Sequence, residues 1–203
     1  MRLAILTGLY VGVVCSAQIG ANKIVELPWQ NLAAPGGTYL IGVSLALVEL
    51  AHLTAPTRRD GWVNAEVMVV CGFAASGILA GWIAAVNAMR PAFPGQHFGE
   101  LADTWRIVLA SLAAFAVSET VDNTIGAWMR GRFPDATRVL ATNAVSAPLD
   151  SLVFLSAAFG SLSFIEGQIV AKLEATVVIG LPVVLLLRRY VRPAHGNIVL
   201  AAR

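Results

Sequence analysis

Long apolar runs are the feature that most restricts what this chain can fold into. Six runs, each of roughly the 20 residues that cross a ~30 Å hydrocarbon core as a helix, recur along the sequence. Only 13% of the residues are charged, whereas an ordinary soluble domain carries about 25%. Because open strand edges cannot be satisfied in lipid, every run is expected to be an α-helix. The sequence therefore predicts an all-α integral membrane protein, a bundle of six transmembrane helices.

The predicted spans fill the chain and leave no room for a second domain, so residues 1–203 are expected to form a single transmembrane domain. The spans lie at about 3–21, 33–55, 63–89, 106–129, 139–160 and 164–187. Turn-rich segments separate them, and the segment 90–105 is the only long connection.

The positive charges predict the orientation of the bundle. Ten of the 14 Lys and Arg residues fall at alternate ends of the spans. They are Arg2, Arg58, Arg59, Arg130, Arg132, Arg138, Arg188, Arg189, Arg192 and Arg203. By the positive-inside rule these ends face the cytoplasm, which places both termini there. An even number of spans independently puts both termini on one side.

Ionisable residues inside the spans mark the candidate site. Such a group at a helix centre costs ~2.5–3.5 kcal/mol even on the lenient insertion scale, so each one is a functional candidate. A rise of about 1.5 Å per residue, counted from the cytoplasmic arginines, places four carboxylates from three helices near the middle of the membrane. They are Glu49, Glu119, Asp122 and Asp150, and Lys172 is the one cation expected within reach of them.

Polar residues share helix faces with these acids. Asn143, Ser146 and Asp150 follow i, i+3, i+7 spacing, and Ser118 precedes Asp122 by one helical turn. Pro148 cannot donate to the carbonyl of Ala144, so it is expected to open the fifth span, and transporters often bind substrates at such breaks. The candidate substrate-binding residues are Glu49, Ser118, Glu119, Asp122, Asn143, Ser146, Asp150 and Lys172.

A short pattern occurs in both the fourth and the fifth span. The residues Ala-Val-Ser, followed after three positions by Asp, occupy 116–122 and again 144–150. An inverted repeat would place two such helices antiparallel at one site. Four identities among seven small positions are weak evidence for a repeat.

The charges leave several functions open. An excess of acids over one lysine means that some acids are protonated or that a cation occupies the site, which allows proton coupling and also a small-cation or amine carrier. An intramembrane enzyme is the rival from another class. It is not favoured, because no GxSxG, HExxH or phosphate-binding glycine motif occurs. We therefore predict no catalytic residue, metal site or cofactor. A transporter needs a cavity lined by several helices, whereas an enzyme needs a nucleophile with a base in reach.

Blocks of residues along the chain resemble one membrane family. They are Trp105–Ser111 with Ala114–Asp122, Ser146–Phe154, Ile169–Lys172, Asn22–Val25 and Ala34–Tyr39. In order and spacing these blocks resemble the queuosine precursor transporter family, also called the VUT family. The resemblance implies a multi-pass protein of the bacterial cytoplasmic membrane. It also implies that this protein takes up 7-deazaguanine precursors of queuosine. The same six-helix form occurs in vitamin-uptake substrate-binding subunits, which leaves a homo-oligomer or an energising partner open.

The chemistry of such a base suits the candidate site. A 7-deazaguanine presents adjacent N–H and NH₂ donors, which match the two oxygens of a carboxylate. Its 6-oxo group needs a donor, for which Lys172 or Asn143 would serve. The expected partners are this small molecule and the lipid bilayer. Nucleic acid is not expected, because no basic stretch is interleaved with aromatic residues.

Overall fold

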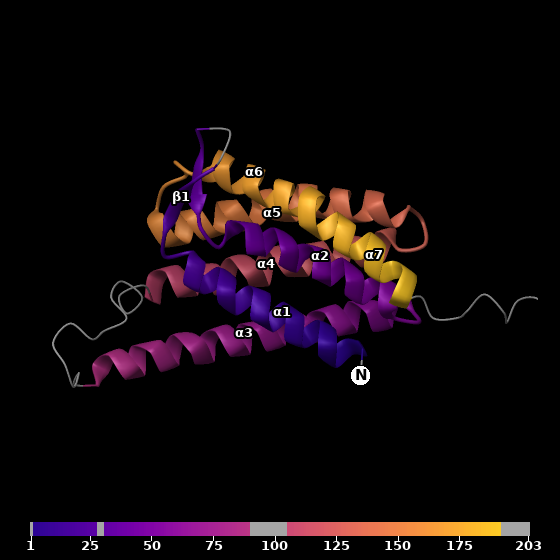
Figure 1. Ribbon diagram of the computed structural model, residues 1–203, viewed down its shortest axis with the longest axis horizontal. Coiled ribbons are helices and arrows are strands. Elements are labelled where there is room, and N and C mark those ends of the chain that lie inside the picture. Colours follow the sequence, from indigo (N-terminus) through magenta and orange to yellow (C-terminus); the bar gives the residue numbers. More distant parts are fainter. Residues whose placement is uncertain (1, 28–30, 90–104, 192–203) are drawn as a thin grey trace, which may run out of the picture.

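The computed structural model describes residues 2–27, 31–89 and 105–191, and in this part of the chain helices run side by side along the long axis (Figure 1). The elements are α1 (Arg2–Gly20), β1 (Ile24–Glu26), β2 (Ala33–Pro35), α2 (Thr38–Thr54), α3 (Arg58–Ala88), α4 (Trp105–Met129), α5 (Asp135–Phe159), α6 (Ile165–Ala175), the π-helical segment η2 (Thr176–Gly180) and α7 (Leu181–Val191). The predicted connection over 90–105 and the arginines at 192 and 203 lie outside the described residues, apart from residue 105 itself.

The helical, membrane-spanning character of the chain agrees with the prediction. Among the described residues four helical segments are long and apolar enough to cross a membrane: Leu3–Gly20, Arg58–Ala88, Asp135–Phe159 and Ile165–Leu186. Helix α2 is apolar but has 17 residues, and α4 has 25 residues and carries buried acids. The start of α1 and the end of α7 lie at the same end of the bundle (Figure 1).

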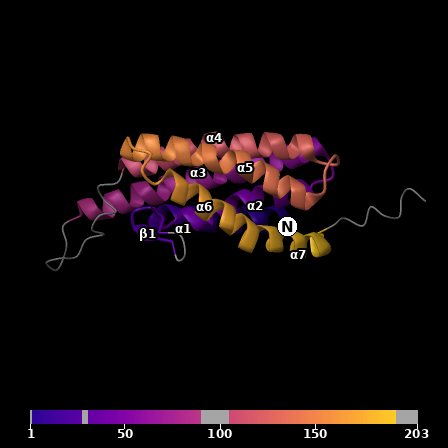
Figure 2. The ribbon, with the colours of Figure 1, turned by 90° about the horizontal axis from the view of Figure 1, so that it is seen from above.

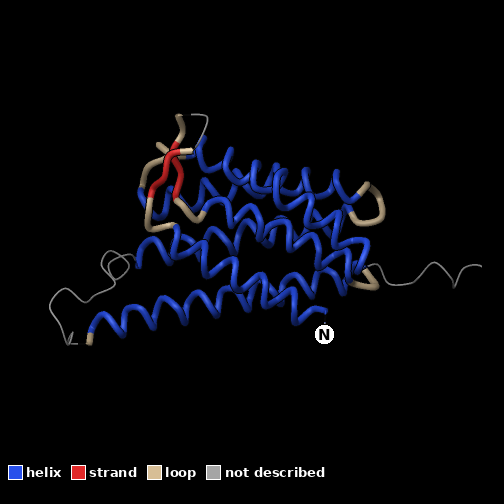
Figure 3. The backbone as a smooth tube through the Cα atoms, in the orientation of Figure 1, coloured by secondary structure: helices blue, strands red, loops and turns tan. Residues whose placement is uncertain are grey.

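The start of the second span was predicted wrongly. Residues 33–35 form strand β2, which pairs antiparallel with β1, and α2 begins only at Thr38. The two strands form a small hairpin at the end of the bundle opposite the N-terminus (Figure 3). Pro35 has a fixed φ and Gly37 packs directly on α1, where a Cβ would overlap the Ala17 carbonyl. These residues favour a tight, extended connection over an earlier helix start.

The fifth span also differs from its prediction. Helix α5 begins at Asp135 rather than 139, so Arg138 lies in its first turn and is 1% exposed instead of marking the aqueous boundary. The helix continues through Pro148 without a break. The irregular segment lies instead in the sixth span, where η2 separates α6 from α7. Single π-helical turns are frequent at functional sites.

Helices α4 and α5 are the most closely packed pair and lie adjacent in two perpendicular views (Figure 2). The connection 130–134 is short, so the two helices are antiparallel. Apolar residues of α1, α2 and α3 form the largest hydrophobic cluster beside them. Large apolar side chains such as Val70, Ile78 and Trp82 point outward from α3. Such an apolar exterior fits a surface that faces lipid, and it leaves the polar residues to the interior.

Candidate functional site

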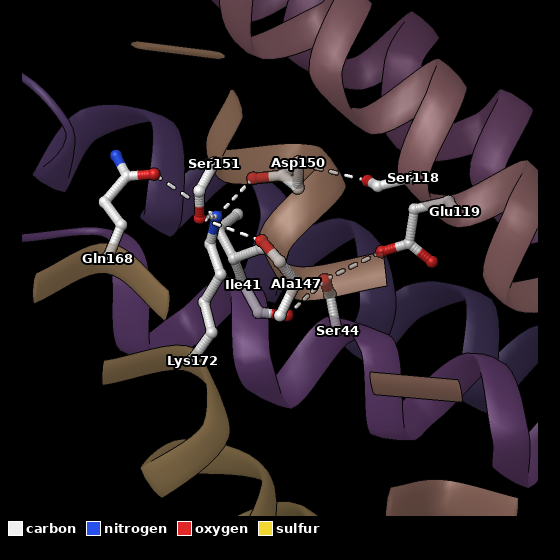
Figure 4. A network of polar contacts seen from close by, with 9 residues as sticks. All are labelled: Ile41, Ser44, Ser118, Glu119, Ala147, Asp150, Ser151, Gln168 and Lys172. Atoms are coloured by element: carbon white, nitrogen blue, oxygen red, sulfur yellow. Dashed lines mark hydrogen bonds and ion pairs between the residues drawn. The ribbon is translucent and has the colours of Figure 1, made fainter. Parts of the chain in front are cut away.

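A buried ion pair joins α5 to α6. The Nζ atom of Lys172 lies 2.5 Å from Oδ2 of Asp150, and these residues are 1% and 5% exposed. Lys172 also donates to Oγ of Ser151 at 2.7 Å and to Oε1 of Gln168 at 3.3 Å (Figure 4). Gly42 lets α2 approach this turn, because a Cβ there would lie 2.5 Å from the Lys172 carbonyl oxygen. The three donor positions of the ammonium group are therefore all used.

A cavity lies against this ion pair. Asp150, Lys172, Gln168, Ser111 and Thr38 provide its polar lining. Its apolar lining consists of Ala17, Ala21, Pro35, Gly37, Ile41, Ala114, Phe115 and Phe154. The lining thus comes from β2 and from helices α1, α2, α4, α5 and α6, which is the ring of several helices expected for a transporter. About 20 Å³ is open to the centre of a water molecule, which is room for about one water. A larger ligand would require its walls to separate.

The Ser and Asp residues of the short repeated pattern bond reciprocally between α4 and α5. Ser118 on α4 donates to Oδ1 of Asp150 at 3.0 Å, and Ser146 on α5 donates to Oδ1 of Asp122 at 3.1 Å. The two segments are therefore antiparallel and meet at one place, as an inverted repeat would. Only Asp150 has a lysine partner, so the two halves of this arrangement differ in charge.

Glu119 and Asp122 lie behind the cavity, one helical turn apart on α4, and both are fully buried. Oε1 of Glu119 accepts a hydrogen bond from Ser44 on α2 at 3.0 Å (Figure 4). The Tyr10 hydroxyl lies beside the same carboxyl group. Oε2 of Glu119 and Oδ2 of Asp122 have no hydrogen-bond partner among the described residues.

A second buried ion pair lies closer to the end of the bundle that holds the α4–α5 connection. Oε2 of Glu49 on α2 lies 2.5 Å from a guanidinium nitrogen of Arg138 on α5, and each residue is 1% exposed. Gly126 on α4 provides the space, because a Cβ there would overlap Oε1 of Glu49. Asp135, 3.7 Å from Arg138, continues this contact toward the helix start.

The predicted site residues are all buried, but they fall into distinct places. Asp150 and Lys172 line the cavity. Ser118 does not line it but donates a hydrogen bond to Asp150. Glu119, Asp122 and Ser146 form the layer next to them, and Glu49 belongs to the second ion pair. Asn143 donates to the Val139 carbonyl at 2.8 Å and accepts from Thr176, the first residue of η2, at 3.0 Å.

Several residues of the site were not predicted. Gln168 lies one turn before Lys172, a spacing that the sequence contains. Ser44 and Phe115 carry no sequence signal of their own, because isolated serines and phenylalanines occur throughout apolar spans. Arg138 was read as a boundary residue because the start of α5 was placed too late. Among the described residues, no group of three His, Cys, Asp or Glu side chains is arranged to hold a metal ion.

Comparison with known families identifies the chain. A family model described as "putative vitamin uptake transporter" matches residues 56–187, which is more than half of the sequence. The chain belongs to this family. The match confirms the resemblance to the VUT family, and it contains Glu119, Asp122, Asp150 and Lys172. No curated protein and no solved structure matches the chain. Membership in this family makes the protein a multi-pass membrane transporter.

Proposed function

We propose that this transporter takes up a flat, neutral 7-deazaguanine-type base, a precursor of queuosine, across the bacterial cytoplasmic membrane. We further propose that α2 and α4 also cross the membrane, giving six crossings with both termini in the cytoplasm. Uptake is coupled to protons. The observation that carries the proposal is the cavity at Asp150 and Lys172, which is lined by a neutralised ion pair and by two aromatic residues.

The charge of the cavity favours a neutral ligand. Lys172 lies 2.5 Å from Asp150, so the one carboxylate of the lining already has a cationic partner. An amine or metal cation entering here would have to displace Lys172, which is buried and has no exposed place to go. A neutral base can bind without displacing this charge. This argument favours a base over the small-cation or amine carrier.

The shape and polarity of the lining suit a flat heterocycle. Phe115 and Phe154 offer apolar surfaces on which a planar ring can stack. Asp150 would accept from adjacent N–H and NH₂ groups, and Lys172 or Gln168 would donate to a 6-oxo group. The lining thus combines a few donors and acceptors with mostly apolar walls, which is the usual composition of a small-molecule site.

The family description supports a second candidate. It names vitamin uptake, so a vitamin is the alternative substrate class, and the protein would then be a substrate-binding subunit driven by an energising partner. A heterocyclic vitamin would meet the same aromatic and polar lining residues. A panel of competing ligands separates the two candidates.

The proposal is tested by uptake in a bacterial strain that cannot synthesise queuosine. Cells that express the protein are given radiolabelled 7-cyano-7-deazaguanine, with the empty vector as control. We expect label to appear in tRNA only in expressing cells, and excess unlabelled deazaguanine to compete while simple amines and vitamins do not. Equal labelling in both strains would contradict the proposal, and competition by a vitamin alone would favour the second candidate.

A further inference from the structure

The buried charges of the described helices do not balance. Four carboxyl groups are at most 5% exposed, and two cations are at most 1% exposed. Each cation already has its own partner, because Lys172 pairs with Asp150 and Arg138 pairs with Glu49. Glu119 and Asp122 are left without a cation.

These two acids cannot both be charged at low cost. Each is 0% exposed, and they lie at i and i+3 on α4, where side chains are neighbours. An unpaired carboxylate in a low-dielectric interior loses several kcal/mol of solvation, and a second one beside it adds repulsion. Their hydrogen bonds do not remove this cost, since the donors beside them are neutral hydroxyl groups, Ser44 and Tyr10 at Glu119 and Ser146 and Thr142 at Asp122.

The pair is separate from the cavity and yet connected to it. Neither Glu119 nor Asp122 lines the cavity. Ser118, which precedes Glu119, donates to Asp150, and Ser146 on the helix of Asp150 donates to Asp122. A change of charge at the pair therefore changes the electrostatic environment of Asp150, the carboxylate that faces the cavity.

We propose that Glu119 and Asp122 form the proton-binding site of the transporter, distinct from the place where substrate binds. The pair holds one proton. That proton enters from outside with the substrate and leaves toward the cytoplasm, so that the pair gains and then loses one positive charge per cycle. The inference rests on the proposed function, because it assigns the coupling to residues. Glu49 and Arg138 lie on the cytoplasmic side of the pair and are the groups toward which the proton leaves.

Several titratable and charged groups surround Glu119 and Asp122, so the protonation of the pair depends on all of these groups. The titratable and charged groups on the packed helices are Tyr10 on α1, Glu49 and His52 on α2, Glu66 on α3, Arg138 and Asp150 on α5, and Lys172 on α6. Of these, Arg138 and Lys172 are the cations that form ion pairs, and each is paired to another acid.

The first test needs no substrate. Infrared difference spectra of the protein in membranes report the C=O stretch of protonated carboxyl groups. We expect such a band at neutral pH in the wild-type protein, and we expect Glu119→Gln combined with Asp122→Asn to remove it. Glu66→Gln, which changes an acid that contacts α4 through Asn123, is the matched control and should leave the band in place. A wild-type protein without this band, or a double variant that keeps it, would overturn the inference.

The second test measures coupling in liposomes with acid outside. One proton per substrate supports up to about tenfold accumulation per pH unit, since 1.4 kcal/mol is tenfold in an equilibrium. The double variant should bind 7-cyano-7-deazaguanine within about twofold of wild type and exchange it across the membrane, but it should not accumulate it. Loss of binding would make the pair substrate ligands, and gradient-driven accumulation would exclude it as the proton site. Failure of the wild-type protein to bind any deazaguanine would instead refute the proposed function, while the infrared test would still decide on the proton site.

Discussion

Replacing Asp150 by Asn separates the structural role of this residue from its role in binding. The carboxylate has two tasks, because Oδ2 contacts Lys172 at 2.5 Å and Oδ1 accepts from Ser118 at 3.0 Å. An amide of the same shape has only one oxygen, so it can serve only one of these donors. Lys172, 1% exposed, is then left with the neutral partners Ser151 and Gln168.

The expected magnitudes differ for stability and for binding. Removing one partner of a buried ion pair destabilises a protein by about 3–5 kcal/mol, because the other charge stays buried without compensation. Losing one charge-assisted hydrogen bond to a substrate costs about 1.5–3 kcal/mol, which corresponds to roughly 10- to 150-fold in affinity. Asp150→Asn should therefore lower both the unfolding temperature and the affinity.

A second variant distinguishes the two effects. Combining Asp150→Asn with Lys172→Gln removes both charges, so most of the lost stability should return while binding stays weak. The assay is thermal unfolding in detergent together with equilibrium binding of 7-cyano-7-deazaguanine, with Ser161→Ala in the exposed α5–α6 connection as control. If Asp150→Asn is as stable as wild type and binds normally, the reasoning about this ion pair is refuted.

Three further outcomes are expected. Gly126→Ala should lower stability by about 1–3 kcal/mol in thermal unfolding, because the new Cβ overlaps Oε1 of Glu49, whereas Gly77→Ala, with open space at its Cβ, should not. Gly167→Ala should reduce uptake while surface expression persists, because the new Cβ overlaps the Ala33 carbonyl and displaces the β1–β2 hairpin at the cavity. Uptake at the wild-type level would exclude this role of the hairpin. Reporter fusions at the C-terminus and within 90–105 should report the cytoplasm and the outside respectively, and the reverse result would invalidate the proposed orientation.

The pattern of charges along the spans was sufficient to find the polar centre of the bundle. Helical spacing and depth counted from arginines are local properties, so they predict from the sequence alone that Asp150, Lys172, Glu119 and Asp122 lie together. Family membership rested on the same segments and is confirmed. Local spacing cannot say which oxygen faces the cavity, and for that reason the separation of the pair Glu119 and Asp122 from the cavity was not foreseen.

Other features depended on contacts between distant segments. Pro148 was expected to interrupt α5, yet packing against α4 and α6 keeps the helix continuous, and the irregular turn occurs at Thr176–Gly180 instead. The pairing of Glu49 with Arg138 spans 89 positions of the sequence, and no short-range pattern predicts it. The hairpin over β1 and β2 is also a product of tertiary packing, since three-residue strands have no clear alternation.

Binding of small molecules to the purified protein tests the central claim most directly. Isothermal titration in detergent would compare 7-cyano-7-deazaguanine with guanine and with simple amines at equal concentrations. The account predicts saturable binding of 7-cyano-7-deazaguanine, weakened about tenfold or more in Asp150→Asn, and no saturable binding of the amines. Saturable binding of amines without binding of any deazaguanine would contradict it.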